Sequence, residues 1–135
     1  MRKLTTAIAT AATIAVSGAA YACGVCIEDK VAATYDHAVI HDAMASHRQV
    51  IFVALEGRDG ALAGERIIAA ARRVPGMQTA SVRYAAAPPA FSFAISKNVA
   101  PDKALAAFQT ATKGMDVQMR VVRIMRDGAL VDPPG

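Results

Sequence analysis

Tryptophan is absent from this chain of 135 residues, and aromatic residues make up only 5% of it. Apolar residues nevertheless reach 54%, which excludes an intrinsically disordered chain and leaves alanine, valine and isoleucine to build the core. Two cysteines are too few for a small disulfide scaffold or a four-cysteine zinc module. The length suits one domain.

The first 22 residues have the pattern of a secretory signal peptide. Met1 to Lys3 form a basic start, residues 4–20 carry no charge, and Ala20-Tyr21-Ala22 is the small-x-small pattern that signal peptidase cleaves. The uncharged run contains five threonines and serines and no basic cluster follows it, which disfavours a membrane anchor. We therefore predict a signal peptide over residues 1–22 and a periplasmic or secreted mature protein without a transmembrane segment.

Cleavage after Ala22 has two consequences for the mature chain. It removes Arg2 and Lys3, so the net charge falls from +4 to +2, and no basic run or aromatic-basic face remains for a nucleic-acid partner. It also makes Cys23 the first residue, which leaves acylation to a lipoprotein as an alternative. Lipoprotein signals usually have leucine three residues before the cysteine, where this chain has Ala20, and small residues between, where it has Tyr21.

The mature chain divides into a helical arm over residues 23–48, an alternating unit over residues 49–126 and a polar tail over residues 127–135. Residues 25–47 lack proline and glycine and predict one helix. The unit that follows predicts strands over 49–55, 79–84, 91–95 and 117–125, with helices over 61–74 and 102–112. This order indicates an α+β fold, a ferredoxin-like βαββαβ sandwich with an antiparallel sheet and two helices on one face.

The alternating unit resembles the heavy-metal-associated (HMA) domain family in the spacing of several short motifs. That family has Gly-Met-Thr-Cys-x-x-Cys between its first strand and first helix, closes the helix with Leu-Pro-Gly-Val and opens its second strand with Ala-Ser-Val. The matching residues here are Phe52-Val53, Gly57, Val74-Pro75-Gly76-Met77 and Ala80-Ser81-Val82, in one register within residues 49–125. The resemblance implies the fold of copper-chaperone modules, which often dock on related domains.

This chain departs from the family at the metal loop itself. The two cysteine positions are occupied by Gly60 and Ala63, and Arg58 replaces the methionine. Neither glycine nor alanine offers a side-chain donor to a soft metal. We therefore expect no metal site in this loop, and metal transport does not follow from the resemblance alone.

The two cysteines form a C-x-x-C pair, Cys23-Gly24-Val25-Cys26, at the start of the arm. Such a pair binds one soft ion such as Cu(I) or Zn(II), cycles between dithiol and disulfide, or forms a structural disulfide in an oxidising compartment. A helix dipole favours the first two uses because it stabilises a thiolate at the helix start. The Gly-Val dipeptide between the two cysteines resembles the redox motif of thioredoxins. A thioredoxin fold needs a strand before that motif, however, and cleavage after Ala22 leaves no residues for one.

His37 and His41 are weaker candidates for metal ligands. They are four residues apart, so they share one face of a helix, as paired imidazole ligands do. Along a straight helix, however, Cys26 and His37 lie about 16 Å apart, so a joint site with the cysteines requires a bent or broken arm. The alternative is that both histidines are surface or packing residues.

Two hypotheses of function and a third, simpler reading follow. No other catalytic constellation is found in the sequence, so we predict no enzyme unless the cysteine pair has a redox role. The first is an exported heavy-metal-binding protein, a carrier or chaperone for copper(I) or another soft ion, with Cys23 and Cys26 as ligands. The second is a thiol-disulfide redox or assembly factor that uses the same pair on a periplasmic partner. The third reading is an interaction module in which Cys23 and Cys26 form a structural disulfide.

Overall fold

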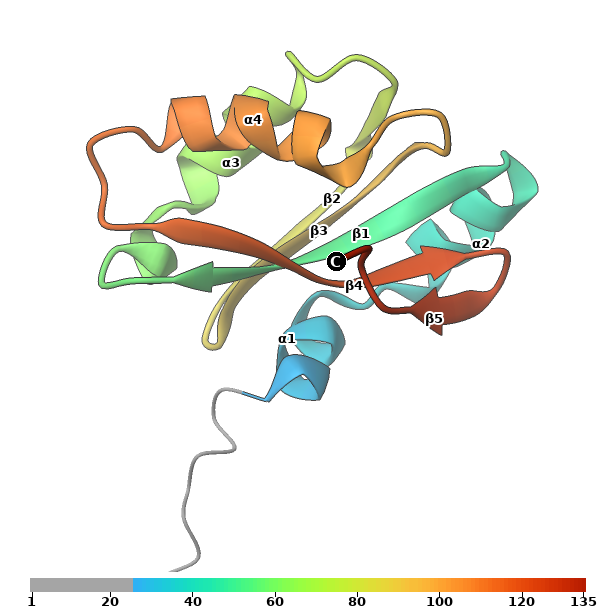
Figure 1. Ribbon diagram of the computed structural model, residues 1–135, viewed down its shortest axis with the longest axis horizontal. Coiled ribbons are helices and arrows are strands. Elements are labelled where there is room, and N and C mark those ends of the chain that lie inside the picture. The colour runs from blue at the N-terminus through green and yellow to red at the C-terminus, as the bar shows by residue number, and fades with distance from the viewer. Residues whose placement is uncertain (1–25) are drawn as a thin grey trace, which may run out of the picture.

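The computed structural model describes residues 26–135, which form an α+β fold around a five-stranded antiparallel sheet (Figure 1). The helices are α1 (Ile27–Thr34), α2 (His37–Ala45), α3 (Gly64–Ala71) and α4 (Pro101–Ala111), with a short 3-10 helix η2 (Gly60–Leu62). The strands are β1 (Arg48–Glu56), β2 (Met77–Ala86), β3 (Pro89–Ser96), β4 (Gln118–Arg126) and β5 (Ala129–Val131). The predicted signal peptide and Cys23 lie outside the described residues.

The strands lie in the order β2-β3-β1-β4-β5, so β1 is the central strand. Val50 of β1 lies opposite Ala94 of β3 on one side and Met125 of β4 on the other. The uninterrupted apolar run of β1 fits this place, because helices cover both of its faces and seven of its nine residues are buried. The predicted α+β class is confirmed, and β1, α3, β2, β3, α4 and β4 follow one another in the predicted order.

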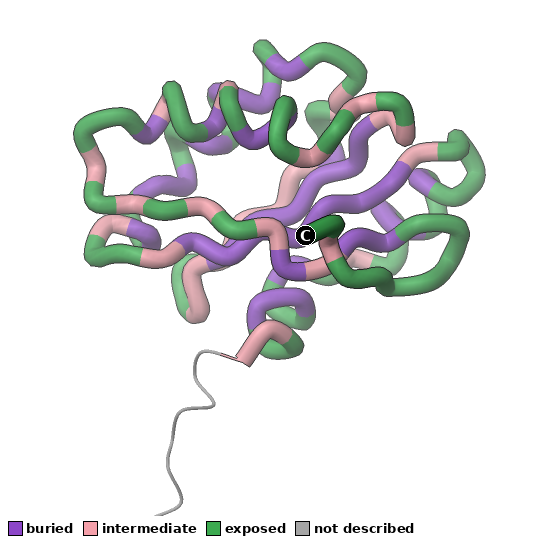
Figure 2. The backbone as a smooth tube through the Cα atoms, viewed as in Figure 1, coloured by how far each residue is buried: buried purple, intermediate pink, exposed green. Residues whose placement is uncertain are grey.

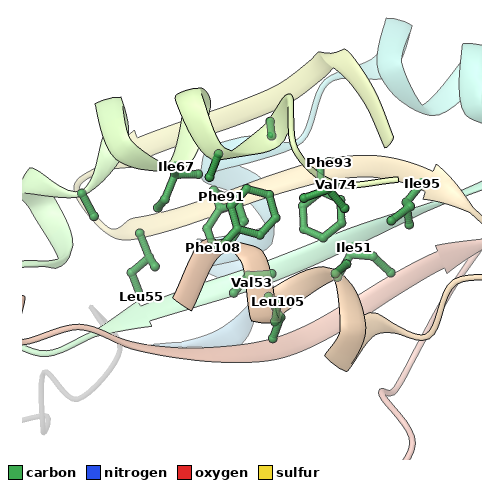
Figure 3. Close-up of a cluster of buried hydrophobic side chains, with 14 of the residues drawn as sticks. Ile51, Val53, Leu55, Ile67, Val74, Phe91, Phe93, Ile95, Leu105 and Phe108 are labelled. Carbon is green, nitrogen blue, oxygen red and sulfur yellow. The ribbon is translucent and has the colours of Figure 1, made fainter. Parts of the chain in front are cut away.

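Helices α3 and α4 cover one face of the sheet, as expected, and enclose the larger core (Figure 3). Alternate residues of β1 and β3 point into this core. Phe108 of α4 contacts the rings of Phe91 and Phe93 at centroid distances of 4.9 and 5.2 Å. Three of the four phenylalanines therefore lie together where α4 meets β3. The labelled core residues are Ile51, Val53, Leu55, Ile67, Val74, Phe91, Phe93, Ile95, Leu105 and Phe108.

Helices α1 and α2 cover the opposite face of the sheet and enclose a second core (Figures 1 and 2). Val31 of α1 and Ile40 of α2 are buried there against Val50 and Phe52 of β1. The segment predicted as an arm is thus a packed layer of the fold. The sheet lies between two helical layers rather than having two helices on one face alone.

The prediction of one continuous helix over residues 25–47 is wrong, because the chain leaves the helix at Tyr35 and Asp36. Both residues have extended backbone angles, and the Asp36 carboxylate accepts hydrogen bonds from the amides of Ala38 and Val39 at 2.9 and 3.3 Å. An aspartate in this position caps the N-terminus of a new helix. The break lets two short helices follow the twisted sheet face.

The C-terminal segment, predicted as a polar tail, contains strand β5. Asp127 and Gly128 form the two-residue turn between β4 and β5, with φ angles of 52° and 81°. Two positive φ values are typical of the type I′ turn that Asp-Gly favours in hairpins. The tail prediction is therefore wrong for residues 127–131, which extend the sheet by one short strand.

A register shift in the β1–β4 pairing changes which way Arg123 points. Val121 lies opposite Val53, whereas Arg123 lies opposite Phe52, so an extra residue separates the two pairs. Val53 belongs to the core under α3 and α4, and Phe52 belongs to the core under α1 and α2. In a regular strand Val121 and Arg123 would lie on one face, and the bulge moves Arg123 to the side of α1.

Candidate functional site

Cys26 stands immediately before the first turn of α1, as the residue that caps this helix. Its backbone is extended, with φ and ψ of −62° and 141°, and its carbonyl accepts the amide of Lys30 at 3.4 Å. The side chain is partly exposed. Cys23 lies three residues earlier, outside the described part of the chain. The second thiol of the pair is therefore fixed to the folded protein at the beginning of a helix.

The sheet holds α1 through buried side chains and one interlayer hydrogen bond. Lys30, Val31 and Thr34 form its buried side. The hydroxyl of Ser92 on β3 donates to the carbonyl of Thr34 at 3.0 Å, and this bond is buried. Arg123 of β4 adds an ion pair of 3.4 Å to Glu28, whose side chain is largely exposed. Because α1 is anchored along its length, the position of Cys26 relative to the sheet is defined.

An apolar groove of about 430 Å³ lies beside α1, between this helix and the β4–β5 hairpin. Ile27, Val31 and Tyr35 line one side, and Leu130 lines the other. Arg123 borders the groove and bonds Asp132 at 3.1 Å as well as Glu28. The groove therefore combines an apolar surface along α1 with one guanidinium group.

The junction of α1 and α2 is fixed by an ion pair to the edge strand. Nε of Arg83 on β2 donates to the Asp36 carboxylate at 2.8 Å. This bond and the amide of Val39 hold the pKa of Asp36 below its ordinary value. The break between the two helices is therefore a defined turn, tied both to α2 and to β2.

His37 and His41 both lie on the exposed side of α2. The nearest charged group to His41 is the adjacent Asp42, with 3.9 Å between Nδ1 and the carboxylate. Within residues 26–135, no three side chains of histidine, cysteine, aspartate or glutamate lie close enough to hold a metal ion. The broken arm thus does not bring Cys26 and the two histidines together as one three-residue site.

The loop that contains Gly60 and Ala63, in which we expect no metal site, is closed by packing. Gly60 and Ala63 are both buried, and the hydroxyl of Tyr84 donates to the Gly60 carbonyl at 2.8 Å. A Cβ added to Gly64 would lie only 2.6 Å from the Tyr84 ring. Arg58 points to the outside and pairs with Asp116 at 2.9 Å. This loop has no donor side chain at the two positions, and Tyr84 leaves no room for a side chain at the neighbouring Gly64.

Sequence reasoning missed two residues that belong to the surroundings of Cys26. Lys30 is only 4% exposed although it is charged, and Arg123 reaches the groove only because of the bulge in β4. The position of Lys30, one helical turn after Cys26, was the available signal. No signal in the sequence marked the bulge.

Comparisons with known proteins found no family model, no curated protein and no solved structure that matches this chain. In the part of the chain that the structure describes, no helix is long and apolar enough to cross a membrane.

Proposed function

We propose that this protein is an exported carrier of a soft metal ion, copper(I) in the first place, with Cys23 and Cys26 as the ligands. The observation that carries the proposal is the position of Cys26 at the start of a helix anchored to the sheet. Two thiolates at this spacing suit a two-coordinate soft ion. The loop at Gly60 and Ala63 supplies no competing site.

We also propose that the domain is a ferredoxin-like, HMA-type module. The order β2-β3-β1-β4, with α3 and α4 in the two crossover connections, supports this assignment. Helices α1 and α2 and strand β5 are additions to that arrangement. In this interpretation the fold is retained, whereas the metal-binding cysteines belong to the sequence that precedes β1.

The chemistry of the proposed carrier is ligand exchange without a change of oxidation state. A thiolate of a partner protein attacks the bound Cu(I), a three-coordinate intermediate forms, and one of the carrier's sulfurs leaves. A second exchange releases the ion to the partner. The partly exposed Cys26 gives a partner access to the ion, and the apolar groove along α1 offers a contact surface.

The test is a competitive titration of the reduced mature protein, residues 23–135, with Cu(I) in the presence of a soft-metal chelator. We expect one equivalent to bind, and Cys26→Ser to weaken binding strongly because one thiolate ligand is lost. His41→Ala is the matched control, since this exposed imidazole lies on α2, and its effect is expected to be small.

Two results would contradict the proposal. One is a reduced parent protein that binds no Cu(I), in which case the redox or structural use of the pair replaces the metal site. The other is a Cys23→Ser, Cys26→Ser variant that binds Cu(I) as well as the parent. Intact mass of the exported protein checks the N-terminus, because cleavage after Ala22 gives the mass of residues 23–135 without acyl chains.

A further inference from the structure

The two helical layers of the protein differ in charge. In the layer formed by α1 and α2, residues 26–47 contain four acidic residues and one lysine, which is buried. In the α3–α4 layer, residues 60–76 and 100–114 contain five basic residues and only two acidic ones. The basic residues are Arg66, Arg72, Arg73, Lys103 and Lys113, and the acidic ones are Glu65 and Asp102. The sheet therefore separates an acidic layer from a basic one.

The basic side chains of the α3–α4 layer are not neutralised by acidic neighbours. All five are exposed, and within residues 26–135 none of them forms an ion pair. Arginines outside the layer do form such pairs, as Arg58 does with Asp116 and Arg120 with Glu56. The α3–α4 layer therefore presents a positive potential that attracts anionic partners.

A groove of about 240 Å³ between α3 and α4 combines two of these arginines with small side chains. It is lined by Arg66, Ala69, Ala70, Arg73 and Ala111. The two arginines are two helical turns apart, which is about 10 Å along α3. A guanidinium group binds phosphate through two parallel N–H bonds, and the alanines leave room for phosphate groups to approach. This part of the layer thus fits an array of phosphates.

The same layer also exposes apolar side chains. Leu62 of η2 is 73% exposed and Ile68 of α3 is 51% exposed, more than any other large apolar side chain within residues 26–135. Helices α3 and α4 lie side by side on one face of the sheet, so their exposed sides form one broad surface (Figures 1 and 2). Basic groups at the headgroups and aliphatic groups at the acyl boundary are the two contributions that hold a protein on an anionic bilayer.

We propose that the α3–α4 layer is a peripheral binding surface for an anionic phospholipid membrane. The unpaired cations hold the phosphate headgroups, and Leu62 and Ile68 enter the interface. Charge alone would suffice for an acidic polypeptide, whereas the two aliphatic side chains favour a lipid surface. The acidic α1–α2 layer then faces away from the membrane, and Cys26 stays on the side open to a soluble partner. The surface shares no residue with the proposed metal site, so either can fail without the other.

The test is sedimentation of the reduced mature protein with vesicles of phosphatidylcholine alone, or of equal parts phosphatidylcholine and phosphatidylglycerol. Arg66→Gln with Arg73→Gln removes two unpaired charges from the layer. Arg58→Gln with Arg120→Gln is the matched control, because it lowers the net charge equally at two arginines that already pair with acids. All four side chains are exposed, and thermal unfolding confirms that each variant is folded.

We expect the parent protein to bind the vesicles that contain phosphatidylglycerol and not those of phosphatidylcholine alone. Each basic residue near an anionic surface strengthens binding by roughly fivefold, so Arg66→Gln with Arg73→Gln should weaken it by roughly thirtyfold. The control variant should weaken it much less. A parent that does not prefer the anionic vesicles overturns the inference, and so does an equal loss in the two double variants.

A third variant distinguishes a membrane from an acidic polypeptide as the partner. Leu62→Ser with Ile68→Ser keeps every charge of the layer and removes the aliphatic groups. We expect this variant to bind the anionic vesicles roughly tenfold more weakly than the parent, because less apolar surface is buried in the interface. Binding as tight as that of the parent would show that charge alone is recognised, and would overturn the membrane assignment in favour of an acidic polypeptide.

Discussion

Replacing Ile40 by alanine tests whether α1 and α2 are part of the cooperative fold. Ile40 is 5% exposed and packs with Val39 and Ala43 against the central strand. The substitution removes three carbon atoms from a buried site. The neighbouring sheet holds the surrounding residues in place, so they cannot move in to fill the cavity. Transfer and cavity terms together give a loss of about 3 kcal/mol in the free energy of unfolding. For a domain of this size we expect the thermal midpoint to fall by roughly 10–15 °C.

The assay is thermal unfolding of the mature protein followed by circular dichroism, with two isoleucines of α3 as references. Ile67→Ala removes the same atoms from the core under α3 and α4, where Ile67 is 0% exposed, and should lower the midpoint by a similar amount. Ile68→Ala, at a position 51% exposed, should change it little. The reasoning is refuted if Ile40→Ala behaves like Ile68→Ala, or if it produces a second, separate transition.

Three further predictions concern the thiols, the helix junction and the hairpin. Cys23→Ser with Cys26→Ser should keep the thermal midpoint within a few degrees, because the short loop between the thiols removes little entropy from the unfolded chain; unfolding at room temperature would contradict this. The pKa of Asp36 is lower in the folded state, so its stabilising effect should be complete above about pH 4 and disappear as the pH falls further. In Asp36→Asn the thermal midpoint should therefore depend less on pH in this acid range. An unchanged pH dependence would show that the Asp36–Arg83 pair does not cause it. Gly128→Ala should lower the midpoint by a few degrees, since φ is 81° there and alanine disfavours it by about 1 kcal/mol, and an equal or higher midpoint would contradict the turn assignment.

The sequence predicted the strands and helices whose pattern of apolar residues matches the faces that the fold buries. The run Val50 to Val53 is apolar throughout because both faces of β1 are covered, and the alternation of Phe91, Phe93 and Ile95 marks one buried face of β3. The helices that became α3 and α4 were found from their apolar faces and from the proline at the start of α4.

Where prediction failed, a short-range signal competed with a longer pattern. Asp36 is a good N-cap residue, but the absence of glycine and proline around it suggested an uninterrupted helix. Asp127-Gly128 is a strong hairpin signal, but together with the final Pro133-Pro134-Gly135 it suggested a polar tail. The β4 bulge that turns Arg123 toward α1 depends on packing against β1, which the strand's own residues do not encode.

For the candidate site, the sequence supplied the cysteine pair but not its surroundings. Spacing alone identified Cys26 as a ligand candidate, and the structure places it at the start of an anchored helix. The burial of Lys30 depends on how α1 lies on β3 and β1, and thus on tertiary packing. His37 and His41 follow the predicted helical spacing, yet spacing does not determine whether a third ligand approaches them.

The central place of β1 also bears on when the chain can fold during synthesis. Val50 needs both Ala94 and Met125 as neighbours, and these residues are made long after it. Pairings so distant along the chain slow folding, because the entropy of closing a long loop is lost before the stabilising contacts form. A nascent chain of this protein therefore keeps its most apolar strand without both of its partners until β4 has been synthesised. We expect limited proteolysis of ribosome-bound chains to show protection of β1 only after β4 has emerged.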